Sequence, residues 1–187
     1  VYHGPDGLKK IATTVHERAN HIAAAMGNAQ INTAYFDTLK IKVNDSDALR
    51  KAAESKSINL RYFSDGHVGV SVNELTGDSD VAELIALLGG KATDSAGHAI
   101  KGFERTSTYM THPVFNTHRS ETEMLRYLKK LENKDLSLAH AMIALGSCTM
   151  KLNATSEMMP LTWTEFADIH PFAPSNQAQG YAEIISE

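Results

Sequence analysis

Apolar residues at three- and four-residue steps predict two long helices within the first ninety positions. Asp6 is placed to cap the first of these, over 6–27, and Gly27 suits its end. Asp78-Ser79-Asp80 opens the other helix, and Gly89-Gly90 stops it. The apolar face of the first helix comprises Leu8, Ile11, Val15, Ala19, Ile22 and Met26.

Three short segments between these helices have the pattern of strands. Polar and apolar residues alternate over 38–43, which predicts a half-buried strand. Strands are also expected over 58–63 and 68–72, joined by a hairpin turn at Asp65-Gly66. Asn44-Asp45-Ser46-Asp47 caps a short helix that runs to about Ser55. With this helix, the order of elements predicts an α/β (α+β) fold. We expect a small mixed or antiparallel sheet with helices on a face.

The second half of the chain is less regular. Residues 90–119 show little periodicity and are interpreted as a connector. Ser120-Glu121-Thr122-Glu123 is a capping box that predicts a new helix, and a shorter one is expected over 137–143. Thr162-Trp163-Thr164-Glu165 is a second capping-box candidate, and a last helix begins near 176. The pattern divides the chain into a small domain, 1–107, and a helical and extended arm, 108–187.

Composition limits the class of protein. The 187 residues are 42% hydrophobic and 21% charged, with a mean hydropathy of −0.27, as in a folded globular protein. No apolar run reaches the ~20 residues of a membrane span. Net charge is −4 and the pI about 6.1, so the basic footprint of a nucleic-acid-binding domain is missing. The single cysteine, Cys148, forms no internal disulfide, which favours a reducing compartment.

The two ends of the sequence suggest a piece of a longer protein. The chain opens on Val1 without an initiator methionine. Near its last residue, Tyr181, Ile184 and Ile185 keep helical spacing, so the chain stops inside an expected helix. A processed or trimmed small protein is the alternative.

General catalytic motifs are not met. Gly90-Lys91 lacks the glycine of a phosphate-binding loop, because Ile85 stands there and Ala92 replaces the Ser or Thr. The nine histidines have no zinc-ligand spacing, so no metal site is expected. A Cys–His hydrolase would need a base near Cys148, which the sequence alone does not supply.

One polar segment, 146–153, has the composition of an anion-binding loop. Ser147, Cys148 and Thr149 follow a glycine, and Lys151 adds a cation. Such a loop can offer hydroxyl and backbone donors to a carboxylate or phosphate. A buried polar turn is the alternative interpretation. Lys151 could also suggest a Schiff-base lysine, but a lone lysine in a loop is far more often a solvated charge.

Several ordered strings of residues resemble one family. The chain resembles the glycine decarboxylase P-protein, most closely in 112–172 and more loosely in 44–110. The resemblance rests on 2–8 (YHGPDGL), 35–39 (YFDTL), 112–116 (HPVFN), 118–124 (HRSETEM), 145–153 (LGSCTMKLN) and 163–172 (WTEFADIHPF).

The resemblance implies a pyridoxal phosphate (PLP) enzyme that decarboxylates glycine and passes the aminomethyl group to the lipoyl arm of the H-protein. It implies that 1–107 is the small domain ending the N-terminal fold-type I half. Residues 108–187 would then be the linker and N-terminal arm of the C-terminal, PLP-binding half. The family's PLP lysine belongs to a downstream His-Lys-Thr, which does not occur here. No catalytic residue is therefore expected in this chain, and Lys151 is not assigned the Schiff base.

The resemblance also identifies candidate contacts for substrate or cofactor. They are Ser147, Cys148, Thr149, Lys151, Asn153 and His170. For His170, a packed residue beside Pro171 is an equal alternative. Expected partners are the lipoylated H-protein, the remainder of the P-protein and a further copy in a homo-oligomer, without nucleic acid or membrane. The expected location is the bacterial cytoplasm, or the mitochondrial matrix in a eukaryote.

A second hypothesis comes from the first ninety residues alone. Their element order also suits a regulatory or small-ligand-binding α+β module. Such a module has no reason to carry the 145–172 segment, which distinguishes the two hypotheses. If the P-protein interpretation holds, 108–187 should be loosely attached, domain-swapped or expose an apolar patch.

Overall fold

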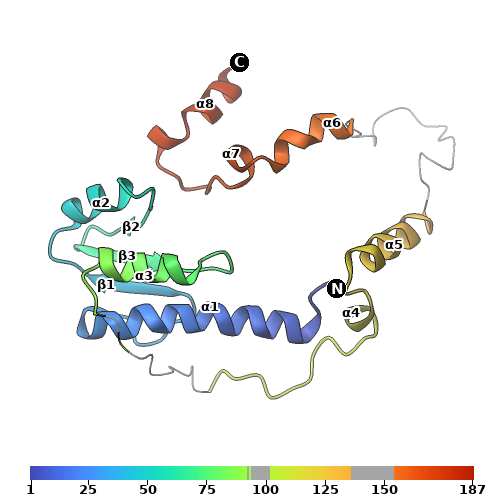
Figure 1. The fold of residues 1–187 in the computed structure, drawn as a ribbon, viewed down its shortest axis with the longest axis horizontal. Helices are drawn as coiled ribbons and strands as arrows, with labels where there is room; N and C mark the ends of the chain where they lie inside the picture. Colours follow the sequence, from blue (N-terminus) through green and yellow to red (C-terminus); the bar gives the residue numbers. More distant parts are fainter. Residues whose placement is uncertain (92, 94–101, 136–153) are drawn as a thin grey trace. The chain divides into compact units, whose positions relative to one another are not determined.

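Helix α1, Gly4–Met26, is the longest element of the first structural unit (Figure 1). The computed structural model describes residues 1–91, 93, 102–135 and 154–187. These residues form two units, 1–131 and 132–187. The first unit contains α1, the 3-10 turn η1 (Gly27–Ala29), β1 (Thr38–Lys42), α2 (Ser46–Glu54), β2 (Arg61–Tyr62), β3 (His67–Ser71), α3 (Asp78–Leu87), α4 (Val114–Thr117) and all but the last residue of α5 (Glu121–Glu132).

The sheet is antiparallel with strand order β1-β3-β2, which confirms the predicted α/β class. Leu39 lies opposite Val70 and Ile41 opposite Val68, so these four residues share one face. Lys40 lies opposite Gly69 on the other face. The predicted hairpin is confirmed, because β2 and β3 pair around the turn that contains Gly66.

Helices α1 and α3 pack against each other, and both contribute to a core on the apolar face of the sheet (Figure 1). Full burial of each large side chain there stabilises the fold by about 1.5–3 kcal/mol. The largest fully buried side chains are Ile22, Leu39, Ile41, Val68 and Val70. The helical and strand periodicities of 1–88 therefore converge on one core.

Two helix starts illustrate how well capping was predicted. At α2 the Asp45 carboxylate accepts the backbone N–H groups of Asp47 and Ala48, as the sequence indicated. At α1 the prediction was wrong, because the helix already begins at Gly4 and Asp6 lies inside its first turn. Pro5 favours the earlier start, since its fixed φ suits a first helical turn and it lacks the N–H that would be unpaired.

Part of the predicted connector packs on the start of α1. The Tyr109 hydroxyl donates to the Pro5 carbonyl at 2.8 Å. Gly4 has a positive φ of 64°, and a Cβ built there would lie 2.5 Å from Arg119 Nη2 and 2.9 Å from the Phe115 carbonyl oxygen. These contacts place 109–119 in the first unit. The assignment of 1–107 and 108–187 to two halves of a parent enzyme stays a prediction.

The second unit consists of short elements. They are α6 (Thr155–Met158), η3 (Met159–Thr162), α7 (Thr164–Ala167), η4 (Ser175–Gln177) and α8 (Gln179–Ser186). None of these elements buries a side chain. The second capping box is not formed, because Thr162 donates to the Met159 carbonyl and α7 has no side-chain cap. The helix expected over 137–143 lies outside the described residues.

Candidate functional site

His170 is the one predicted site residue whose surroundings the structure describes. It follows α7 in a turn where the backbone N–H of Phe172 donates to His170 Nδ1 at 3.0 Å, and the N–H of Ala173 donates to its carbonyl. A neutral ring that accepts at Nδ1 carries its proton on Nε2. The side chain is exposed, so Nε2–H is available as a hydrogen-bond donor.

The other predicted site residues are not among those that the structure describes. They are Ser147, Cys148, Thr149, Lys151 and Asn153. The structure therefore neither joins them to His170 nor separates them from it. Their role as contacts for substrate or cofactor stays a prediction.

Aromatic residues precede and follow the His170 turn along the chain, and one of them, Phe172, contacts the His170 ring. Phe166 lies 6.3 Å from Trp163 and 6.0 Å from Tyr181 between ring centroids, and the Tyr181 hydroxyl donates to the Phe166 carbonyl at 2.8 Å. The Phe172 ring lies 5.8 Å from that of His170 and is 90% exposed. Contacts between Phe166 and Tyr181 therefore join α7 to α8, while the side chains of Phe172 and His170 are exposed.

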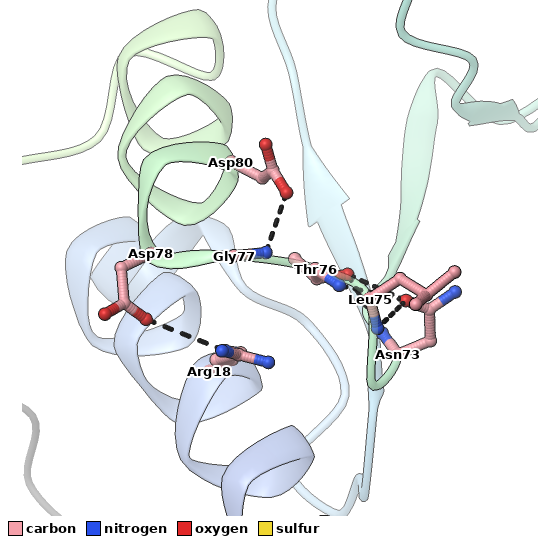
Figure 2. Close-up of polar contacts among 7 residues, drawn as sticks. All are labelled: Arg18, Asn73, Leu75, Thr76, Gly77, Asp78 and Asp80. Carbon is pink, nitrogen blue, oxygen red and sulfur yellow. Dashed lines mark hydrogen bonds and ion pairs between the residues drawn. The ribbon is translucent and has the colours of Figure 1, made fainter.

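In the first unit, the loop before α3 is held by hydrogen bonds between side chains and backbone that the sequence did not predict. The Asn73 side-chain oxygen accepts the backbone N–H groups of Leu75 and Thr76 at 2.9 and 3.1 Å, and Thr76 Oγ1 accepts the N–H of Asn73 (Figure 2). Gly77 N–H then donates to Asp80 Oδ2 at 2.7 Å. The Asn at 73 and the Asp three residues after Gly77 were the signals that could have found it.

This loop also carries the ion pair between α3 and α1. Arg18 Nε lies 3.7 Å from Asp78 Oδ1, at the first residue of α3 (Figure 2). Asp78 is almost fully exposed, so the pair contributes little to stability. The arrangement defines the start of α3 beside α1, and its two carboxylates are engaged with Arg18 and with the Gly77 N–H.

A concave region of about 770 Å³ lies where the end of α1 meets α2 and the end of α3. Lys42, Asp45 and Lys91 supply its charges, and Leu49 and Leu88 are among its apolar residues. Its described lining residues include no histidine, cysteine or serine. It can accommodate an apolar group, and nothing in its described lining suggests a reaction.

The outer face of the sheet holds a cluster of charges around the hairpin. Lys40 Nζ lies 2.6 Å from Asp65 Oδ2, and His67 Nδ1 lies 2.9 Å from Asp65 Oδ1. The hydrogen bond from Lys40, followed by that from His67, holds the pKa of the Asp65 carboxyl well below its usual range. The Phe63 ring lies beneath two cations, Lys40 at 4.9 Å and Arg61 at 4.7 Å. This cluster joins the hairpin to β1.

Two further properties concern only the part of the chain that the structure describes. Within it, no three or more His, Cys, Asp or Glu side chains gather where they could hold a metal ion. No helix in the described ranges is long and apolar enough to cross a membrane.

Comparison with known proteins shows what the sequence is similar to. Residues 1–88 match the family model described as glycine cleavage system P-protein. Over its whole length the chain is 50% identical to the glycine dehydrogenase (decarboxylating) of Shewanella amazonensis, covering 21% of that protein. The chain is similar to that enzyme throughout its length. The corresponding enzymes of Stutzerimonas stutzeri and Deinococcus radiodurans are also 50% identical, with 21% and 20% of each covered.

The chain thus spans about a fifth of the length of these P-protein relatives. A PLP site needs a lysine for the cofactor aldehyde and several donors for its phosphate. Of the predicted set, the structure describes only His170, whose Nδ1 is already engaged. The described residues do not assemble such a site by themselves, so no chemical step is assigned to them.

Proposed function

We propose that this chain works as part of a PLP-dependent glycine decarboxylase, the P-protein of the glycine cleavage system. That enzyme releases the glycine carboxylate as CO2 and transfers the aminomethyl group to a lipoylated H-protein. The main support is the 50% identity to glycine dehydrogenases (decarboxylating), which extends over the whole chain rather than over the first unit alone. A separate small-ligand-binding module would not need the similarity of 89–187.

Within that enzyme, we assign a binding role to the polar loop and to the His170 turn. PLP, when bound, supplies the electron sink for decarboxylation. Ser147, Cys148, Thr149, Lys151 and Asn153 would donate to the substrate carboxylate or the cofactor phosphate and so orient the substrate. His170 would add its Nε2–H, which the bond from Phe172 to Nδ1 leaves free to donate.

The proposal makes the chain dependent on other polypeptide. The PLP lysine would come from a segment that this sequence lacks, so the isolated chain would neither bind PLP covalently nor decarboxylate glycine. The partners would be the rest of the P-protein, a second copy in a homo-oligomer and the H-protein. The location would be the cytoplasm of a bacterium, or the mitochondrial matrix of a eukaryote.

A chimera tests the proposal. The 187 residues replace the aligned segment of the Shewanella amazonensis enzyme, and glycine decarboxylation is measured with PLP and lipoylated H-protein. We expect the chimera to be active and His170→Ala to lower its activity. His21→Ala, which removes an exposed histidine of α1, is the matched control and should leave activity unchanged. A chimera that folds and binds PLP but is inactive contradicts the proposed function. Equal activities of both histidine variants contradict only the role of His170.

A further inference from the structure

Helix α5 has an apolar face that the first unit leaves open. Leu125, Leu128 and Leu131 are 58%, 49% and 41% exposed, and none of the twelve residues of α5 is buried. Met124 completes the same face, because positions 124, 125, 128 and 131 lie together on a helix. Arg126 and Lys130 point to the opposite side. The helix is therefore amphipathic without a described partner for its apolar face.

The contacts of the first unit explain α5 only in part. Its Tyr127 ring stacks on His118 at 4.2 Å, which attaches one flank of the helix. The core of the unit is made by α1, α2, α3 and the sheet, and it includes no residue of α5. The exposed parts of these three leucines would be stabilised by burial against another apolar surface. The face is thus unnecessary for the core and unfavourable if left in solvent.

We propose that the apolar face of α5 is a contact surface for the four fifths of a P-protein to which this chain does not correspond. This inference rests on the proposed function. It is supported by the length of the relatives, each about five times as long as the segment matched here. Such a length supplies ample polypeptide to cover the face within the same enzyme.

Two other occupants have to be distinguished from the rest of the enzyme. A second copy of α5 could pair in antiparallel fashion, since Glu121 and Glu123 begin the helix and Lys129 and Lys130 end it. Four apolar side chains are, however, far fewer than the roughly 20–30 residues that each partner gives to a stable interface. The second unit of this chain is the other candidate. Its short helices bury none of their own residues and expose apolar side chains such as Ile184 and Ile185, so the experiment below includes it as a separate outcome.

Hydrogen exchange of the α5 amides tests the proposal in the isolated chain and in the chimera described above. We expect fast exchange in the isolated chain and strong protection in the chimera. Leu128→Glu should reduce that protection roughly tenfold or more, since it replaces one leucine of the contact with a charge. Thr122→Glu is the control, because it adds the same charge to an exposed position on the same helix.

Each other outcome has a definite meaning. Equal exchange of α5 in the chimera and in the isolated chain overturns the proposal. Protection already present in the isolated chain and lost in Leu128→Glu also overturns it. If that protection depends on protein concentration, a second copy covers the face. If it does not depend on concentration, the second unit of this chain covers it. An inactive chimera with protected α5 would instead count against the proposed function while leaving this contact in place.

Discussion

Two tyrosines of the first unit allow the same substitution, Tyr to Phe, to be compared at a hydroxyl with a hydrogen-bond partner and at one without a described partner. The Tyr35 hydroxyl donates to the Asn20 side-chain oxygen at 2.9 Å, and Asn20 is only 5% exposed. The Tyr62 hydroxyl is buried, and no described residue offers it a hydrogen bond. Burial raises the pKa of both phenols, which agrees with their sheltered positions. We predict that Tyr35→Phe destabilises the unit and Tyr62→Phe does not.

The magnitudes follow from what each hydroxyl leaves behind. Removing the Tyr35 hydroxyl leaves the buried Asn20 oxygen without this donor, at a cost of about 1–3 kcal/mol. Removing the Tyr62 hydroxyl takes away a group that was desolvated without a partner. The free energy of unfolding of Tyr62→Phe should lie within about 0.5 kcal/mol of that of the unsubstituted chain, or slightly above it. The ring contacts, including Arg50 over Tyr62 at 4.2 Å, are kept in both variants.

Urea unfolding followed by far-ultraviolet circular dichroism is the appropriate assay. The 23 residues of α1 make it the largest single contributor to the helical signal of the first unit. Fluorescence of the single tryptophan, Trp163, would report on the second unit instead. Equal m-values are required for the comparison of midpoints. An equal loss in both variants, or a larger loss for Tyr62→Phe, would refute the reasoning.

Three further predictions concern charge, backbone and cofactor. The folded-state pKa of Asp65 is lowered, so its contribution to stability is complete above the usual carboxyl pKa of about 3.9 and is lost as pH falls toward the folded value. Asp65→Asn should therefore flatten the acid side of a plot of urea midpoint against pH, and an unchanged slope would contradict this. Gly4→Ala places a Cβ against Arg119 and Phe115 at positive φ. It should cost more than about 1 kcal/mol and speed proteolysis within 102–119, whereas Gly180→Ala, in α8 with open space around it, should be neutral or stabilising. Incubation of the isolated chain with PLP and borohydride should give no stoichiometric adduct by mass spectrometry. A specific adduct at Lys151 would contradict the prediction that the PLP lysine lies outside this chain.

Local elements were largely predictable from the sequence because their causes are local. The alternation at 38–43 and the Asp65-Gly66 turn specify a strand and a hairpin through side-chain direction and glycine geometry, and both are present. The helix that begins after Ser120 is also present, with Glu123 N–H donating to Ser120 Oγ at 3.2 Å. The start of α1 was missed because two signals, Asp6 and Pro5, compete over two residues.

The candidate site was predictable only as a set of residue types. The ordered strings from 112 to 172 indicate the P-protein because long exact sequences are specific, and the comparisons confirm that relationship. No pattern of spacing could tell that Nδ1 of His170 accepts the Phe172 N–H, since that depends on the turn conformation. The predicted role of 147–153 in binding remains to be tested in the chimera.

The sequence by itself determined the type and order of the elements over 1–88 and the resemblance to the P-protein, since periodicity, turn residues and ordered strings lie within short stretches of chain. Tertiary structure decided the strand order β1-β3-β2, the pairing of Asn20 with Tyr35 and the packing of Arg119 against Gly4. Each of these joins residues far apart along the chain. The energies of these contacts depend on which surfaces of the chain meet. The leucines of α5 follow the same principle, because an apolar helical face indicates that a partner is needed but not which one.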